Sequence, residues 1–354
     1  MVSLNKKHRK TPSVSRVLLV WGIKFCLQIS LGIIIGFLLG SNGNIYPNNN
    51  RSLEAEISSL ATSDEKKTDK EGWHSIFVYF GKSDAIQASD APLERKSNIM
   101  EGSQVKQDEM IAALVKTYRE KRHATKASTG KALENHEISR SPYFVDLAAN
   151  DAISLSNTYK LEQLGFEGLC VEPNPVYWFR LAHRKCVVAG AFVGGDRDLQ
   201  EVEVSLENKE HGGIVGKDFD NKRKSKKEKR FTVSIRTMFE QFDVPKRVDY
   251  LSLDVEGAEE LIMKDFPFDT YTISFATIER PKLGLQALME KNGYNFVMLL
   301  VNWGETIWVH NSVLELMSLE EIKGIVSKSK LRERPLQKGE KYFDIKTGQF
   351  KTFQ

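Results

Sequence analysis

The sequence has few cysteines and no pattern typical of a metal site. Only 3 of its 354 residues are cysteine, and none forms a C-x-x-C pair or clusters with histidine. A disulfide-rich scaffold and a structural zinc site are therefore not expected. The chain also lacks a G-x-G-x-x-G turn after its first predicted domain strand, which argues against a pyrophosphate-bearing dinucleotide. The apolar fraction of 41% is that of a globular protein, so a folded core is expected.

Basic residues are concentrated in two short segments. Residues 1–16 contain five basic residues and no acid, and residues 217–230 contain eight basic and three acidic residues. Each segment carries +5, so the rest of the chain carries −6 within a net charge of +4. No nucleic-acid-binding face is therefore expected. The second segment is interpreted as a solvated loop, with an arm that grips an anionic glycan or lipid as the alternative.

A long apolar run follows the basic leader. Residues 17–40 contain only three polar residues, and as a helix they would extend about 36 Å, enough to cross a bilayer. Positive charge on residues 1–16 predicts that this leader stays in the cytoplasm. We therefore expect a single-pass type II membrane protein of the secretory pathway, in the Golgi or the ER, with its domain in the lumen. A cleaved signal peptide is the alternative, and the glycosylation sequon at Asn50 fits a lumenal stem.

The rest of the chain divides into a stem, a domain and a tail. Residues 41–140 are mostly polar and are expected to form a stem with one short helix near 108–122. From 141 to 315, short apolar runs alternate with helical patterns, which is typical of a parallel sheet covered by helices. We predict a Rossmann-like α/β fold there, with a β-hairpin insertion whose basic part is 206–230. Residues 316–354 are expected to form a C-terminal tail.

Polar residues are expected at the carboxyl ends of the domain's strands. In open α/β sheets, ligands bind beyond these ends. Asp146 ends the first predicted strand, and Glu172 ends the second, where a carboxylate can accept hydrogen bonds from both hydroxyls of a ribose. An adenosine ligand without phosphates fits this pattern, and S-adenosylmethionine is such a ligand. The predicted strands are 143–147, 168–172, 185–192, 248–254, 271–278, 295–300 and 306–310, and the predicted helices are 157–164, 175–183, 258–264 and 283–292.

Three segments of the chain together resemble the FkbM-type methyltransferase family. They are PYFVDLAANDAISLSNTYKLEQLGFEGLCVEPNPVYWFRLAHRKC, VDYLSLDVEGAEELIMKDFPFDTYTISFATIERP, and GYNFVMLL with IWVH, and they span about residues 142–310. The resemblance implies a class I, S-adenosylmethionine-dependent O-methyltransferase. It implies that Asp146, Ala148 and Asn150 line the methionine end of the donor. The full candidate donor site is Asp146, Ala148, Asn150, Asp151, Glu172, Pro173, Asn174 and Ala191.

Acidic residues after the fourth and fifth predicted strands are the candidates for catalysis. Methyl transfer needs alignment and removal of a proton from the acceptor hydroxyl, and Asp254, Glu256 and Glu279 could remove it. The same carboxylates could hold Mg²⁺, and the sequence leaves a direct base and a metal open. Asp254 and Glu256 could instead cap the helix that follows them.

The expected reaction is O-methylation of a hydroxyl on a sugar or another acceptor of the secretory pathway. The alternative is a non-enzymatic membrane trafficking protein of the Star type with a methyltransferase-like fold. Cys170 and Cys186 are expected on adjacent strands, either as a disulfide or as two buried thiols.

Overall fold

The computed structural model describes residues 77–80, 102–129, 140–206, 212–216, 219, 227–329 and 333–354. The predicted leader, membrane anchor and sequon lie outside these residues, as does most of the basic part of the insertion. Within the described residues, no helix combines the length and the apolar character needed to cross a membrane. All of them belong to one unit, Leu53–Gln354.

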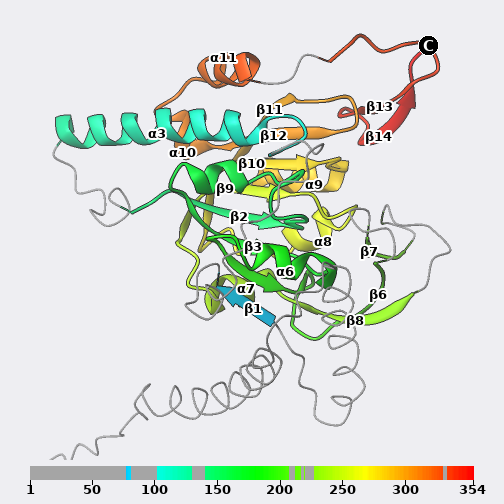
Figure 1. The fold of residues 1–354 in the computed structure, drawn as a ribbon. Helices are drawn as coiled ribbons and strands as arrows, with labels where there is room; N and C mark the ends of the chain where they lie inside the picture. The colour runs from blue at the N-terminus through cyan, green and yellow to red at the C-terminus, as the bar shows by residue number, and fades with distance from the viewer. Residues whose placement is uncertain are drawn as a thin grey trace, which may run out of the picture. The chain divides into compact units, whose positions relative to one another are not determined.

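An eight-stranded sheet forms the centre of this unit (Figure 1). The five strands from β4 to β10 are parallel, whereas β1 and β12 run antiparallel to their neighbours. The strand order reverses between β2 and β9, so the switch point of the sheet lies at their carboxyl ends. In spatial order the strands are β1 (Phe77–Phe80), β4 (Val187–Gly190), β3 (Glu167–Val171), β2 (Tyr143–Leu147), β9 (Arg247–Leu253), β10 (Thr272–Glu279), β12 (Glu305–His310) and β11 (Tyr294–Leu299).

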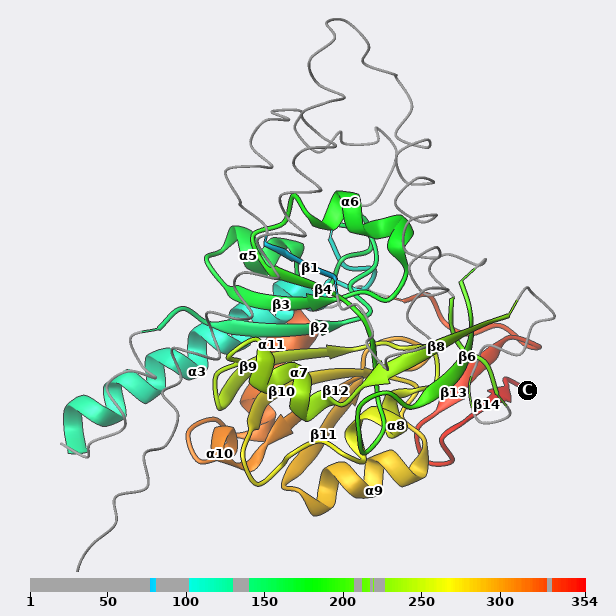
Figure 2. The ribbon, with the colours of Figure 1, turned by 90° about the horizontal axis from the view of Figure 1, so that it is seen from below.

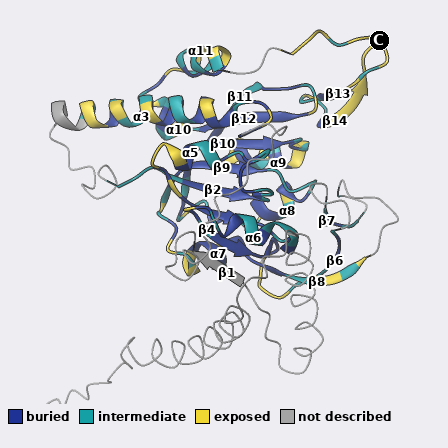
Figure 3. Ribbon diagram, in the orientation of Figure 1, coloured by how far each residue is buried: buried dark blue, intermediate teal, exposed yellow. Residues whose placement is uncertain are grey.

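Helices cover both faces of this sheet, and its central strands are buried (Figures 2 and 3). One face packs against α3 (Gln107–Thr129), α5 (Tyr159–Gln163), α10 (Asn311–Leu314) and α11 (Leu319–Ser329). The other packs against α7 (Ile235–Gln241), α8 (Glu259–Met263) and α9 (Leu283–Lys291). This mixed α/β architecture with a parallel-rich sheet is consistent with the predicted class I methyltransferase fold.

The predicted insertion forms a second, four-stranded sheet. Its strands, in the order β5-β8-β6-β7, are β5 (Phe192–Val193), β8 (Glu228–Val233), β6 (Glu201–Ser205) and β7 (Gly213–Ile214). The antiparallel pairing of β6 with β8 is the predicted hairpin. The expected single strand 185–192 is wrong, because the chain leaves the main sheet after Gly190 and joins this second sheet as β5.

Two segments that the sequence assigned to a stem and a tail pack on the domain. Helix α3 contains the predicted helix 108–122, extends to Thr129 and buries Met110, Leu114 and Tyr118 against the sheet. After residue 316, α11 buries Ile322 and Val326 in the same core. The hairpin β13 (Lys341–Asp344) and β14 (Gln349–Thr352) then docks on the domain, where Phe343 N donates to Asn302 O at 2.7 Å.

Strand β3 is cross-linked by a disulfide, and a tryptophan packs closely behind its carboxyl end. Cys170 in β3 forms a disulfide with Cys186, with Cα atoms 6.1 Å apart, so the two residues are not free thiols. The predicted helix 175–183 is shorter than expected and divides into a 3-10 turn, Pro175–Tyr177, and α6 (Trp178–Leu181). Trp178 Nε1 donates to the carbonyl of Glu172 at 2.7 Å, and its ring covers Gly190 at the end of β4.

Substituting Gly190 should disturb the packing of Trp178 behind Glu172. A Cβ at Gly190 would overlap the ring of Trp178, so Gly190→Ala should lower the free energy of unfolding by about 1–3 kcal/mol. The matched control is Gly324→Ala in α11, where no atom lies within 4 Å of the added Cβ and helix propensity should add about 0.5–1 kcal/mol. Thermal or urea unfolding measures both, and equal effects of the two substitutions would contradict the packing.

Candidate functional site

The carboxyl edge of the sheet gathers acids on one face. Side chains alternate between the faces of a strand, and Asp146 pairs in register with Cys170 and with Ser252. Two residues further along these neighbouring strands come Glu172 and Asp254. Glu279 ends β10 directly opposite Glu305, the first residue of β12. Five carboxyl groups therefore approach the switch point from the face that packs against α3, α5 and α11.

Asp146 is held by a short polar network. Its side chain is buried, and its Oδ2 accepts a hydrogen bond from Thr158 Oγ1 at 2.6 Å. Burial raises the pKa of Asp146, and the Thr158 hydroxyl and the nearby Arg184 guanidinium act in the opposite direction. The charged form therefore depends on these two neighbours and on a hydrogen bond from Ser252.

Glu172 is fixed by backbone amides from two loops. Its Oε2 accepts from Asn150 N at 2.8 Å, and its Oε1 accepts from Asn174 N at 2.7 Å. Burial raises the pKa of Glu172 to about 7, although these two amides oppose the rise. The Nδ2 group of Asn174 is buried and has no hydrogen-bond partner within the described part of the chain. A polar ligand beside Glu172 would satisfy that donor.

The loop after β2 has an unusual backbone. Ala148 (φ +67°) and Asn150 (φ +55°) both adopt the left-handed conformation that favours glycine. The amide of Ala148 donates to Val171 O at 2.9 Å, which holds this loop against the end of β3. Asp151 is turned toward α6, where Arg180 Nε donates to its Oδ2 at 2.6 Å. Burial opposes ionisation of Asp151, but this ion pair and two backbone amides lower its pKa.

The other donor-site candidates lie at the same edge. Pro173 joins Glu172 to Asn174, and Asn174 Oδ1 accepts from Val176 N at the start of the 3-10 turn. Ala191 is buried directly after β4, between the two sheets. The structure thus brings Asp146, Glu172 and Asn174 together, whereas the carboxylate of Asp151 is occupied by Arg180.

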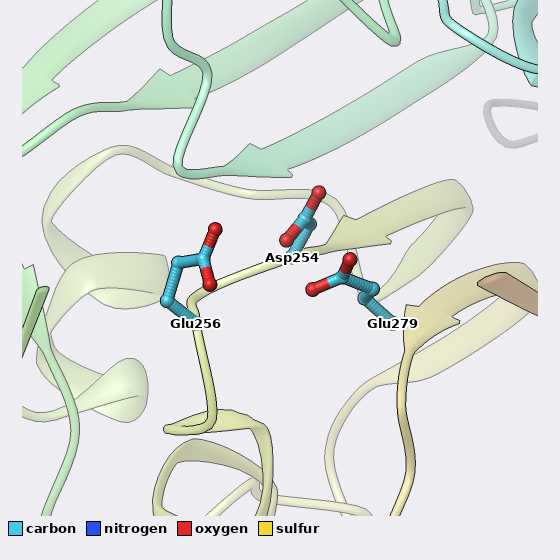
Figure 4. A group of neighbouring side chains, drawn as sticks. All are labelled: Asp254, Glu256 and Glu279. Atoms are coloured by element: carbon cyan, nitrogen blue, oxygen red, sulfur yellow. The ribbon is translucent and has the colours of Figure 1, made fainter. Parts of the chain in front are cut away.

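The three predicted catalytic acids converge (Figure 4). Asp254 follows β9, Glu256 lies in the next turn, and Glu279 ends β10. One ligand atom from each can be chosen so that all three lie within 4.8 Å of one another, which is compatible with a metal ion. Arg280 also reaches this group, because its Nη2 contacts Glu279 and lies 3.2 Å from Glu256 Oε2.

Crowding of acids raises their pKa values. Burial is the largest cause at Asp254, Glu279 and Glu305, and repulsion from Asp254 adds to it at the other two. Arg280 counteracts the rise at all three. A group of carboxyl groups that holds protons near neutral pH can accept or release one during a reaction.

The helix-cap interpretation of Asp254 and Glu256 is wrong, because the N-cap residue of α8 is Ala258 and no side chain caps this helix. The amides of Val255 and Gly257 both donate to Glu259 Oε1, at 3.1 Å each. Glu259 therefore accepts the backbone amides of the turn before α8. The carboxyl groups of Asp254 and Glu256 face Glu279 instead.

Residues 146–296 match the family model described as the methyltransferase FkbM domain. This is the family that the sequence resemblance predicted, and the match covers residues 146–296 of the chain. A comparison with curated proteins gives no match. The matched range includes all the predicted donor-site and catalytic residues, whereas Glu305 lies beyond its end.

Sequence reasoning missed three residues of this site. Glu305 could have been found from a predicted pairing of β12 with β10, because that antiparallel register places it opposite Glu279. Arg280 follows Glu279 directly, but no pattern indicated that its backbone turns left-handed (φ +47°) and directs it toward Glu256. Arg184 gave no signal, since its partners come from a distant loop.

Neutralising one acid should stabilise the fold at alkaline pH. The pKa of Glu279 is raised above its ordinary value of 4.5, so the folded state loses stability as pH rises from about 5. Glu279→Gln should therefore raise Tm by about 2–4 °C at pH 8, which corresponds to about 1 kcal/mol, and less at pH 5. Thermal unfolding at both pH values tests this. Glu290→Gln, at an exposed carboxyl group of α9, is the control and should show no such pH-dependent gain.

Proposed function

We propose that the protein is an S-adenosylmethionine-dependent O-methyltransferase. The observation that supports it best is the surplus of carboxyl groups at the switch point, combined with the unpartnered Nδ2 of Asn174 beside Glu172. A cationic sulfonium relieves repulsion among such acids, and a ribose or adenine acceptor atom satisfies the amide. The family match supports a methyltransferase in general and does not specify O-methylation.

The donor would occupy the ends of β2, β3 and β4. Each oxygen of Glu172 already accepts one amide and retains a lone pair for a ribose hydroxyl. Asp146 would face the methionine end, and Ala191 would lie near the adenine, as the family resemblance implies. Bound in this way, S-adenosylmethionine supplies a methyl carbon on a positively charged sulfur.

Asp254 is the proposed general base. It would accept the proton of the acceptor hydroxyl as that oxygen takes the methyl group that the donor would supply, and the bonding electron pair would leave with the donor's sulfur. Glu279, which hydrogen-bonds Asp254, would orient the base and share the proton. Arg280 already provides positive charge next to Glu256 and Glu279, which favours a direct base over Mg²⁺ at these carboxylates.

A sugar hydroxyl is the proposed acceptor. Trp303 is 42% exposed and lies two residues before Glu305, in the turn against which the C-terminal hairpin docks. The flat apolar ring of tryptophan suits the C–H face of a pyranose, and the nearby carboxyl groups suit its hydroxyls.

A lumenal location in the secretory pathway, behind a single type II membrane span, is part of the proposal. The disulfide between Cys170 and Cys186 supports it, because disulfides persist in oxidising compartments. The apolar run at residues 17–40 supports the membrane anchor.

Donor binding tests the proposal directly. The purified full-length chain in detergent should bind S-adenosylmethionine in isothermal titration calorimetry, and Glu172→Ala and Asp146→Ala should each weaken binding at least about tenfold, or 1.4 kcal/mol. Glu290→Ala, at an exposed site on α9, is the control. Absence of binding by the natural sequence would reject the enzyme and favour the trafficking alternative.

Acceptor recognition is tested at Trp303. With tritiated S-adenosylmethionine and a panel of p-nitrophenyl glycosides, Trp303→Ala should lower kcat/KM about tenfold through loss of one aromatic contact. Its donor affinity should be unchanged. Leu164→Ala, an exposed apolar residue after α5, is the matched control. Methyl transfer to none of the glycosides would contradict a sugar acceptor without affecting the donor site.

A further inference from the structure

Arg184 is a fully buried cation next to the donor site. It forms an ion pair with Glu162, from Nε to Oε2 at 2.9 Å, in which neither side chain is appreciably exposed. Its other donors reach Ala152 O at 3.2 Å, Ser156 Oγ at 3.1 Å and Thr158 Oγ1 at 3.1 Å. These partners all lie in residues 152–162, the segment that leads from the donor loop into α5. One guanidinium therefore organises this whole segment.

Thr158 connects Arg184 to Asp146. The hydroxyl of Thr158 lies 3.1 Å from Arg184 Nη2 and 2.6 Å from Asp146 Oδ2. A guanidinium can only donate hydrogen bonds, and a hydroxyl has a single proton. Thr158 therefore accepts from Arg184 and donates its proton to Asp146, which fixes the direction of the relay.

Negative and positive groups surround Asp146 and act in opposite directions on its ionisation. Burial disfavours its charged form, and the acids Glu172 and Asp254 face the same space. From β9, Ser252 donates to Asp146, and the neutral Tyr250 lies close by. Arg184, arriving from the end of α6, is the positive charge that acts on this carboxyl group.

We propose that Arg184 is a positioning residue, which acts through Thr158 to keep Asp146 ionised and aimed at the cationic end of S-adenosylmethionine. The inference rests on the proposed methyltransferase function. Asp146 alone would touch the donor. Glu162 anchors the relay, because it also accepts the amides of Lys185 at 2.7 Å and Cys186 at 3.1 Å.

A purely structural role of Arg184 predicts something different. In that case, loss of any of its contacts would lower stability, and the pH at which the donor binds would stay the same. Ser156 offers the comparison, because its Oγ accepts from Arg184 as that of Thr158 does, and also from the amides of Thr158 and Tyr159. The side-chain bond to Asp146, however, comes from Thr158 and not from Ser156. The pH midpoint of donor binding therefore separates the two roles.

The test compares S-adenosylmethionine binding by full-length chains between pH 5.5 and 8.5, using isothermal titration calorimetry. Thr158→Val keeps the side-chain shape and removes the hydroxyl, so ionisation of Asp146 should require a higher pH. We expect the pH midpoint of donor binding to rise by about one pH unit, which makes binding about tenfold weaker below the midpoint, with recovery above it. Thr158→Ser should behave like the natural sequence, and Ser156→Ala should keep its midpoint. Titration of the donor itself is common to all variants.

Two results would overturn the relay: an unchanged midpoint in Thr158→Val, or an equal shift in Ser156→Ala. If Thr158→Val does not fold by circular dichroism, Glu162→Gln decides instead. Loss of that counter-charge leaves Arg184 uncompensated and should move the midpoint to lower pH, so an unchanged midpoint would reject the relay. Failure of the natural sequence to bind at any pH rejects the proposed function itself, which is a distinguishable outcome.

Discussion

The candidate site depends on the crowding of carboxyl groups at one edge of a parallel sheet. Carboxylates lose solvation when they are buried and repel one another, so each additional acid makes the next harder to ionise. The protein offsets part of this cost with backbone amides at Glu172 and Glu259 and with the guanidinium groups of Arg184 and Arg280. Charge that remains uncompensated is complementary to a cationic ligand, which explains why a fold would tolerate it.

Register places these acids on one side of the sheet. Because side chains alternate, the pairing of Asp146 with Ser252 also aligns the residues two positions later. A slip of one residue between β2 and β9 would turn Asp146 into the opposite core, among α7, α8 and α9. The large apolar residues of that core, such as Leu147 and Leu253, therefore fix the position of the polar ones.

Much of the fold could be predicted from the sequence, because its central strands are short apolar runs with clear ends. Strand β2 matches its predicted bounds, and β3, β9 and β10 differ from theirs by about one residue. Features set by tertiary contacts could not be predicted. The break after Gly190 depends on pairing with the second sheet. Helices α3 and α11 pack against each other as well as on the main sheet. The partners of Arg184 lie more than twenty residues earlier in the chain.

Under the proposed function, residues inside the FkbM match would bind the methyl donor, and residues beyond it would bind the acceptor. The proposed donor-site residues, from Asp146 to Ala191, lie inside the FkbM match. Glu305, Trp303 and the C-terminal hairpin lie beyond it. The hairpin contacts Gln286 in α9 and Asn302 in the turn after β11. Glu279 connects the two parts, since it belongs to the match and pairs with Glu305. Under the proposed function, binding of a common donor would be retained while residues of the C-terminal part adapt the same acidic group to a particular acceptor.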